Sequence, residues 1–539
     1  MGHWKRWHFM LVVVGLWAFT YLLGLGWGEI KSEEAKRIMP AQTMLASDNW
    51  QAWVLPSVGG EPYYKKPPGI NWLIAASFAL TGSQNEWAAR LPSALLVGLL
   101  AAVMAGLPCA FLSATAQFLA ALILLASVGM LEKGRLIEID GPLTALTGLA
   151  LVWWLYRYAD RPRGWSTWIG AALFLAAGTL LKGPFLAAAA CPVIFLVLVF
   201  RHRLRDLFCP ASLVSLALIL AVGLGWAVLA GRQANTGNMT EIWSSQLATR
   251  FLPSRILWGL WVQEVGGALV LMMPFILLAP LLWMNRFTGH LKPVQLPYIR
   301  ALRWGSAVGF VLLGMIPGAM ARYALPVLPG IALALGAVLE GHRQAVPSDR
   351  WWRVALVAGF VIASAMAVFC LVALGFVYPA GMVVGLLAIA ALVVVVVRPS
   401  VLADGPRLTV ATGLLMCLLA TELMAYSWPF RQQGEMRRPA GAAITRLVGK
   451  DQALDVYRPG YAPFLYYVRC PMRIIASGDS VDPPAQSVLL AGRDPRQPEL
   501  MARLLGQNYH VTYEISLQEG TWQLLQYQDG GPLILENHR

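Results

Sequence analysis

The amino-acid sequence predicts an α-helical polytopic membrane protein that ends in a small α/β domain. Of the 539 residues, 58% are hydrophobic and 13% are charged, and the mean hydropathy is +0.59. A soluble domain is roughly half apolar and about a quarter charged, so this composition indicates an integral membrane protein. Its apolar runs are long enough for membrane-spanning helices, whereas the strands of a barrel are short and alternate. After residue 429 the chain becomes polar, which indicates a second, soluble domain.

The apolar runs within residues 1–429 predict about 13 transmembrane helices. They lie at 9–27, 91–112, 115–131, 141–157, 166–181, 184–200, 211–231, 264–284, 304–318, 322–339, 354–375, 380–397 and 408–428. Lys5 and Arg6 precede the first run, and no small-residue cleavage site follows it, so we expect a retained first helix. With the N-terminus in the cytoplasm, every substantial cytoplasmic loop is rich in arginine, as the positive-inside rule requires. An odd number of spans then places the C-terminal domain on the opposite face.

The first outer loop, residues 28–90, contains two segments that we expect to be surface helices. The apolar run at 70–82 is too short to cross a bilayer and predicts an interfacial or re-entrant helix. The segment at 32–46 has one apolar side and predicts a second helix on the surface, weakened or bent at Pro40.

Residues 430–539 alternate between short β-like runs and polar segments, which predicts a small α/β domain. The expected strands are Leu454–Tyr457, Phe464–Val468, Ser487–Leu490 and Thr521–Tyr527, with a helix at Glu499–Leu505. This region contains no catalytic constellation, and the chain contains no internal repeat that would favour an inverted-repeat transporter.

The net charge of +14 and the six cysteines bear on nucleic-acid binding, disulfide bonds and metal binding. A basic chain can bind nucleic acid, but arginines in cytoplasmic loops and basic residues facing an anionic lipid explain the charge more simply. We therefore expect no nucleic-acid partner. The cysteines follow neither a disulfide nor a metal-binding spacing.

Polar residues gather on the predicted outer face. In a chain of which only 13% is charged, this clustering requires an explanation. They are Glu33 and Glu34, then Tyr64, Lys65 and Lys66 in the first loop; Arg135, Glu138 and Asp140; Lys182; Arg250; and Arg322 with Tyr323. Because an ionised group in hydrocarbon costs ~2.5–3.5 kcal/mol on insertion scales, we expect them to line a wet cavity and to pair with one another or a ligand.

Carboxylates and several cations together suit the displacement of a phosphate leaving group. The cations stabilise the charge that develops on the phosphate, and a carboxylate accepts the proton of the incoming nucleophile. Each residue also has a structural alternative: the acidic pair as a solvated helix face, Lys66 as a lysine extending to lipid headgroups, and Asp140 as a helix cap. The gathering on one face favours function more than any single member does.

The stretches from SEEAKRIMPAQ to YYKKPPG, EWAARLPSA, the isolated Asp140, AGTLLKGP and RYALPVLP resemble one family. It is the group of bacterial membrane glycosyltransferases of the C-type (GT-C) fold that contains protein mannosyltransferases and lipid A aminoarabinose (4-amino-4-deoxy-L-arabinose) transferases. The resemblance spans residues 29–330. It implies inverting transfer of a sugar from a polyprenyl-phosphate donor, normally undecaprenyl phosphate, to an envelope acceptor. Lipid A, a glycan or a protein would be the acceptor, at the periplasmic face of the inner membrane.

The resemblance also implies roles for individual residues. Glu33 takes the place of the acidic residue central to catalysis, with Glu34 and Asp140 beside it. Lys66 of the Lys-Pro-Pro turn matches a ligand of the donor phosphate, and we assign Lys65, Lys182, Arg250 and Tyr323 to the same phosphate. Further cavity residues would be Tyr64, Arg135, Glu138 and Arg322.

Two departures from the aminoarabinose transferases bear on metal binding. A glutamate that can precede the lysine of the turn is Lys65 here, and the histidine that those transferases can present in the loop that here reads SSQLATRF is absent. The glutamate–histidine metal pair of that relative therefore has no counterpart in this sequence. We therefore expect no metal and no other cofactor.

Two other readings remain open. One is an anionic-lipid transporter or flippase, which would need charges deep within its spans, whereas these spans carry almost none. The other is an inactive lipid-binding scaffold of the same fold.

Overall fold

The computed structural model describes most of the chain. The described residues are 5–30, 32–233, 257–345, 379–396, 405–434, 436–460, 462–475, 485–491, 497–517 and 520–528, with isolated positions at 241–245 and 354–398. The expected span at 354–375 lies largely outside the described residues.

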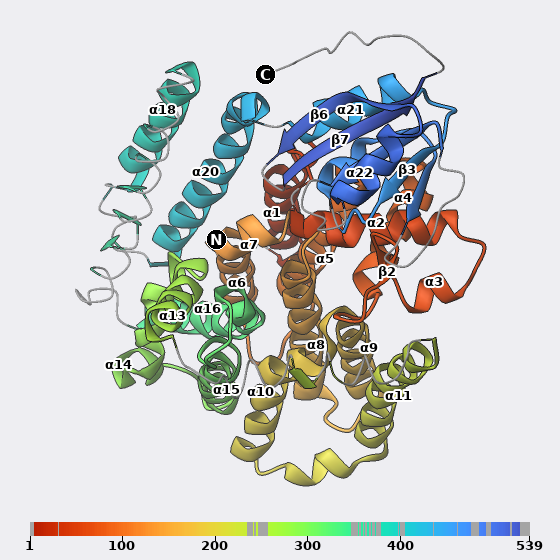
Figure 1. The fold of residues 1–539 in the computed structure, drawn as a ribbon. Helices are drawn as coiled ribbons and strands as arrows, with labels where there is room; N and C mark the ends of the chain where they lie inside the picture. Colours follow the sequence, from red (N-terminus) through yellow and green to blue (C-terminus); the bar gives the residue numbers. More distant parts are fainter. Residues whose placement is uncertain are drawn as a thin grey trace.

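Long helices lying side by side form the main body of the protein (Figure 1). They are α1 (Arg6–Trp17), α5 (Glu86–Gly106), α6 (Ala114–Ala126), α8 (Asp140–Asp160), α9 (Trp165–Lys182), α10 (Ala187–Phe200), α11 (Pro210–Gln233), α13 (Trp258–Leu271), α15 (Leu296–Gly314), α16 (Leu328–Ala345), α18 (Pro379–Val396) and α20 (Gly405–Gly434). Short helical elements join them: η1 (Ala18–Leu22), α7 (Val128–Lys133), η2 (Gly183–Leu186), η3 (Leu204–Phe208), η4 (Phe275–Trp283), α14 (Asn285–Thr288) and η5 (Ala321–Val327).

Four helical segments in the described part of the chain are long and apolar enough to cross a membrane. They are Glu86–Gly106, Trp165–Phe185, Pro210–Gln233 and Ala321–Gly341. The run expected as one span at 264–284 is instead a broken pair, α13 and η4, bent by 94°. Pro274 and Pro280 lie in this region, and each lacks the backbone N–H that a continuous helix needs. The chain is thus a multi-pass membrane protein, and the full count of about 13 spans stays a prediction.

The first loop folds between the helical body and the C-terminal sheet (Figure 1). It contains α2 (Ser32–Ala46), α3 (Gln51–Val54), the hairpin of β1 (Ser57–Val58) and β2 (Glu61–Pro62), and α4 (Gly69–Thr81). Both expected surface helices are present, and α2 continues through Pro40. Helix α4 packs against both α2 and α5, so the loop is folded against the helical body.

The C-terminal segment forms a five-stranded sheet with two helices. Its elements are α21 (Arg437–Val448), β3 (Leu454–Tyr457), η6 (Pro463–Tyr467), β4 (Met472–Ile475), β5 (Ser487–Ala491), α22 (Gln497–Leu505), β6 (Tyr509–Leu517) and β7 (Gly520–Tyr527). The strand order is β4-β3-β5-β7-β6. Strand β3 is parallel to β4 and β5, whereas β7 is antiparallel to β5 and β6. The boundary at residue 430 and the periplasmic location of this unit stay predictions.

The strand expected at Phe464–Val468 is wrong, because those residues lie mainly in the 3₁₀ helix η6. Pro463 occupies its first turn, where the fixed φ of proline suits a helix start and the missing N–H costs nothing. As a result, Tyr466 and Tyr467 lie outside the sheet, and their hydroxyl groups form hydrogen bonds with the backbone of the first loop.

Candidate active site

The first loop and the ends of three helical segments enclose a polar cavity of about 320 Å³. Its walls come from α2, from the turn after β2, and from the ends of α8, α9 and η5 that face the first loop. The lining residues are Glu33, Lys36, Arg37, Tyr63, Lys65, Lys66, Glu138, Ile139, Asp140, Lys182, Met320, Arg322 and Tyr323. Segments far apart in the sequence therefore meet at one site, as the gathering of polar residues predicts.

Helix α2 presents one acid and two cations to the cavity. Glu33, Lys36 and Arg37 are three and four residues apart, so they share a helix face. The Lys36 ammonium lies 2.6 Å from the Glu33 carboxylate, and 39% of the Glu33 side chain is exposed. Partial burial opposes ionisation of Glu33, but the hydrogen bond from Lys36 and the charges of Lys36, Arg37 and Arg322 outweigh it and lower its pKa. Glu33 is therefore an ionised hydrogen-bond acceptor at neutral pH.

The turn with Lys65 and Lys66 is held against the end of α9. Gly69, directly after the two prolines, approaches the backbone of Leu180 so closely that a Cβ would lie 2.6 Å from the Leu180 carbonyl oxygen. Only glycine permits that approach, which brings the lysine turn close to Lys182. The Tyr63 hydroxyl accepts a 3.1 Å hydrogen bond from Arg37 and so ties the turn to α2.

Asp140 and Lys182 form a buried ion pair at two helix ends. Their Oδ1 and Nζ atoms lie 2.5 Å apart. Asp140 begins α8 and Lys182 ends α9, so each charge is favoured by the dipole of its own helix. Gly183 then adopts φ +76°, which ends α9 directly after the lysine. The Lys182 ammonium also lies 3.7 Å from the centre of the Tyr323 ring, a cation–π contact.

Arg322 contacts two acids at the start of α8: Asp140, the first residue of the helix, and Glu138, which precedes it. Its Nε lies 3.1 Å from Asp140 Oδ2, and its guanidinium is 3.9 Å from Glu138. Glu138 in turn pairs with Lys133 at 3.1 Å. Both oxygens of Asp140 thus contact cations, so its negative charge holds Lys182 and Arg322 in the wall of the cavity.

The cavity is positively charged as a whole. Six of its lining side chains are cationic and three are acidic, which gives a formal net charge of +3. Within the described residues, no group of three or more histidine, cysteine, aspartate or glutamate side chains could hold a metal ion. The arrangement suits an anionic group that the cations contact and a nucleophile that Glu33 contacts.

The structure places the remaining predicted residues elsewhere. Glu34 does not line the cavity, because it is fully buried in an ion pair with Arg90 at 2.7 Å. Arg135 is also buried outside it and donates to the carbonyls of Thr20 and Leu23. Tyr64 follows Tyr63 in the turn but does not contribute to the lining. Arg250 lies outside the described residues.

Sequence reasoning missed three polar residues that line the cavity, Lys36, Arg37 and Tyr63. The helical spacing was a usable signal for two of them, since Lys36 and Arg37 follow Glu33 at three and four positions. The choice between Tyr63 and Tyr64 had no such signal, because successive residues of a turn point in different directions.

Comparisons with known proteins bear on the family and the fold of the chain. The family model described as dolichyl-phosphate-mannose-protein mannosyltransferase matches residues 65–226. A curated relative, the undecaprenyl phosphate-alpha-4-amino-4-deoxy-L-arabinose arabinosyl transferase of Pseudomonas savastanoi pv. phaseolicola, is 32% identical over 234 residues. That match spans 41% of this chain and 41% of the relative, so less than half of the relative's length is matched.

Two solved structures cover nearly the whole chain. ArnT from Cupriavidus metallidurans bound to undecaprenyl phosphate superposes with a TM-score of 0.69 at 18% identity, covering 97% of this chain and 98% of ArnT. The apo state of the same enzyme gives 0.65 at 17% identity, covering 96% of each chain. At such identities the likeness shows the fold, which is therefore the GT-C fold of polytopic membrane proteins. Together with the family model and the curated relative, this fold confirms the resemblance to protein mannosyltransferases and lipid A aminoarabinose transferases seen in the sequence.

Proposed function

We propose that this protein is an inverting glycosyltransferase that moves a sugar from an undecaprenyl-phosphate or related polyprenyl-phosphate donor to an envelope acceptor. The reaction would take place at the periplasmic face of the bacterial inner membrane. One observation carries the proposal: the ionised carboxylate of Glu33 shares a cavity of net charge +3 with six cationic side chains. The names of the curated relative and of the ligand-bound ArnT structure, both of which mention undecaprenyl phosphate, support this donor class.

The cations would bind the donor phosphate and stabilise it as it leaves. A polyprenyl phosphodiester has one negative charge and gains a second when the bond to the sugar breaks. Lys65 and Lys66 offer ammonium groups from the turn, and Lys182 offers a third from the end of α9. Each hydrogen bond to a charged group contributes ~1.5–3 kcal/mol, and the share that grows with the developing charge lowers the barrier.

Glu33 would act on the acceptor. In a single displacement, the acceptor oxygen forms a bond to the anomeric carbon while the bond from that carbon to the phosphate oxygen breaks. The acceptor's proton, where it has one, passes to Glu33, and polyprenyl phosphate leaves with the bonding electrons. The lowered pKa makes Glu33 a weak base that is always ionised near neutrality. A weak base is sufficient because phosphate is a good leaving group and the proton is transferred late.

Asp140 would act through the cations it holds. Its two oxygens contact Lys182 and Arg322, so neither is available to a nucleophile. We therefore assign Asp140 to positioning the phosphate-binding cations and leave the reacting proton to Glu33. Glu34, buried against Arg90, would position α2.

Lipid analysis of the purified protein tests the donor assignment. Protein extracted in detergent would be compared with Lys66→Ala by mass spectrometry, with Lys292→Ala in an exposed turn outside the cavity as the control. We expect polyprenyl phosphate or its glycosylated form in wild type and control, and its loss from Lys66→Ala. Bulk phospholipid alone in all three would contradict donor binding.

A transfer assay then separates an enzyme from a flippase or a scaffold. The donor probe is undecaprenyl phosphate-linked 4-amino-4-deoxy-L-arabinose, then other undecaprenyl-phosphate sugars, each with lipid A, glycan or protein as acceptor. We expect release of undecaprenyl phosphate that Glu33→Gln lowers by about 10²-fold or more, since a positioned general base typically contributes roughly 10²- to 10⁴-fold. Movement of the lipid across vesicles without release of sugar would favour the transporter. Binding without either would favour the scaffold.

A further inference from the structure

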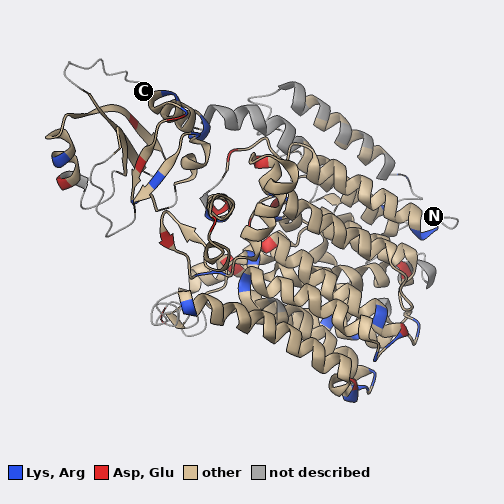
Figure 2. Ribbon diagram, turned by 90° about the vertical axis from the view of Figure 1, so that its right-hand side faces the viewer, with Lys and Arg blue, Asp and Glu red and all other residues tan. Residues whose placement is uncertain are grey.

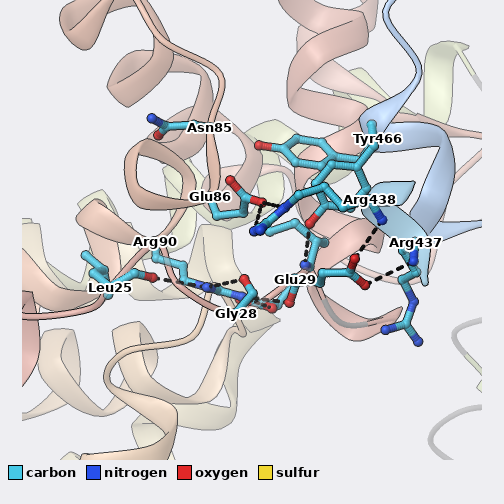
Figure 3. A network of polar contacts seen from close by, with 12 residues as sticks. Leu25, Gly28, Glu29, Asn85, Glu86, Arg90, Arg437, Arg438 and Tyr466 are labelled. Carbon is cyan, nitrogen blue, oxygen red and sulfur yellow. Dashed lines mark hydrogen bonds and ion pairs between the residues drawn. The ribbon is translucent and has the colours of Figure 1, made fainter. Parts of the chain in front are cut away.

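Arg90 of α5 organises the segment that leads into α2. Its side chain has five N–H donors, and all five are used. Nε and one N–H of Nη2 contact the Glu34 carboxylate at 2.7 and 2.8 Å. The other three donors bind backbone carbonyls: Nη1 binds Leu25 and Gly28 at 3.0 and 2.9 Å, and Nη2 binds Glu29 at 3.0 Å. A single buried guanidinium therefore binds Glu34 in the first turn of α2 and the backbone of Leu25, Gly28 and Glu29 before it; Figure 3 shows the three backbone contacts.

The C-terminal unit holds the same short segment from the other side. The Glu29 carboxylate accepts backbone N–H bonds from Arg438 at 2.6 Å and Arg437 at 3.2 Å, and so caps the first turn of α21. An anion at that position is favoured by the helix dipole. The next residue, Ile30, donates its backbone N–H to the hydroxyl of Tyr467 in η6 at 2.8 Å.

A salt bridge closes these contacts into a ring. The Arg438 guanidinium binds Glu86 at 2.6 Å, and Glu86 lies one helical turn before Arg90 on α5. Tyr466 adds a hydrogen bond from its hydroxyl to the carbonyl of Gln84, directly before α5. The path thus runs from α5 through Arg90 to Glu29, into α21, and through Arg438 back to α5 (Figure 3). In Figure 2, acidic segments lie between the C-terminal sheet and the helical body.

We infer that the C-terminal unit is a positioning element for the reaction: by closing this ring it holds the first turn of α2, and with it Glu33, over the cavity. Glu33 is adjacent to Glu34, which Arg90 binds, whereas the lysine turn has, besides its hydrogen bond to α2, a second anchor in the close contact of Gly69 with α9. Opening the ring should therefore displace Glu33 while leaving the lysines of the turn in place. The inference rests on the proposed function, because it assigns a role toward the reacting carboxylate.

The test opens the ring at its exposed corner. Arg438→Ala removes the salt bridge to Glu86, and Arg473→Ala is the matched control. Like Arg438, Arg473 forms a salt bridge, but its partner Asp455, at 2.7 Å, belongs to the C-terminal unit itself, and both residues lie in the sheet. The measurements are hydrogen exchange of residues 29–37, the affinity for undecaprenyl phosphate, and kcat for release of undecaprenyl phosphate from its 4-amino-4-deoxy-L-arabinose form with lipid A.

For Arg438→Ala we expect exchange of residues 29–37 to accelerate about tenfold or more. We expect kcat to fall about 10- to 100-fold, because a 1 Å misplacement of a reacting group can cost 10²-fold, while the affinity for undecaprenyl phosphate stays within about twofold. The control should change none of the three. The charge-swapped pair Glu86→Arg with Arg438→Glu should restore much of kcat, which excludes a general loss of folding.

The outcomes separate the two proposals. Unchanged exchange and kcat in Arg438→Ala would overturn the positioning role while leaving the transfer reaction intact. Loss of lipid affinity in step with kcat would also overturn it, because the whole cavity would then have been disturbed. No transfer by the wild type, with faster exchange in the variant, would refute the proposed function and preserve the mechanical coupling.

Discussion

Two adjacent glutamates of α2 should respond in opposite ways to the same substitution. Glu34 is fully buried and binds Arg90 through both carboxylate oxygens, whereas Glu33 is 39% exposed beside Lys36. Glu34→Gln removes the only acid within ion-pair distance of Arg90 in the described part of the chain. Glu33→Gln removes a charge that water already screens.

The magnitudes follow from burial. Breaking a buried ion pair by removing one partner costs about 3–5 kcal/mol, because the remaining charge is left without compensation. An exposed pair contributes only about 0–1 kcal/mol. A loss of 1 kcal/mol in the free energy of unfolding lowers the unfolding temperature by about 2–4 °C in chains of moderate size, and by less in a longer chain. Glu34→Gln should therefore lower the unfolding temperature by about 5–10 °C. Glu33→Gln should change it by no more than about 2 °C on the same scale.

Intrinsic tryptophan fluorescence during heating reports the unfolding, since the chain has 22 tryptophans. The same samples are then assayed for release of undecaprenyl phosphate. Glu34→Gln should lose stability and retain some turnover at low temperature, whereas Glu33→Gln should keep its stability and lose turnover. Equal unfolding temperatures for Glu34→Gln and wild type would refute the reasoning, as would full turnover by Glu33→Gln.

Four further results are expected. Asp140→Asn removes the acid that pairs with both Lys182 and Arg322, so donor-lipid affinity and turnover should both fall by at least about tenfold, measured by lipid binding and release; unchanged affinity would contradict the role of Asp140. Because the pKa of Glu33 is lowered, its carboxylate is lost only as pH falls through that lowered value, so the acid limb of the pH–rate profile should lie below the usual range of glutamate and should move upward in Lys36→Met. Gly69→Val places side-chain atoms against the Leu180 carbonyl and should weaken binding of undecaprenyl phosphate, whereas wild-type affinity in that variant would show that the close contact does not position the lysine turn. Chelators should leave turnover unchanged, and rescue of a chelated sample by one particular divalent ion would contradict the expected absence of a metal.

Local properties of the chain predicted the helical elements well. Apolar runs predicted α4, α8 and α9, and a one-sided apolar pattern predicted α2; all four begin and end within a few residues of their expected limits. Hydropathy does not predict the break between α13 and η4, because an apolar run that contains prolines has the same mean hydropathy as a continuous span. Likewise η6 was expected as a strand, since a short apolar and aromatic run does not reveal its period.

The candidate site, like the fold, contains features that the local sequence predicts and features that it does not. Residue type and position relative to the membrane predicted Glu33, Lys66, Asp140, Lys182 and Tyr323, and all five line one cavity. Polar residues of this kind can be predicted because an ionised group in hydrocarbon is costly unless it pairs with another group or lines a wet cavity. The sequence by itself thus determined which segments meet at the cavity and which kinds of polar side chain they bring to it.

Only the tertiary structure decided which of two adjacent acids faces the cavity. Glu33 and Glu34 are the same residue type in the same turn of α2, and nothing in their local sequence distinguishes them. Arg90, which follows Glu34 by more than fifty residues, makes the distinction by binding it in the interior. The contact depends on how α5 packs against the first loop and how the C-terminal unit docks on both. Such pairings form between distant segments, so no local pattern encodes them.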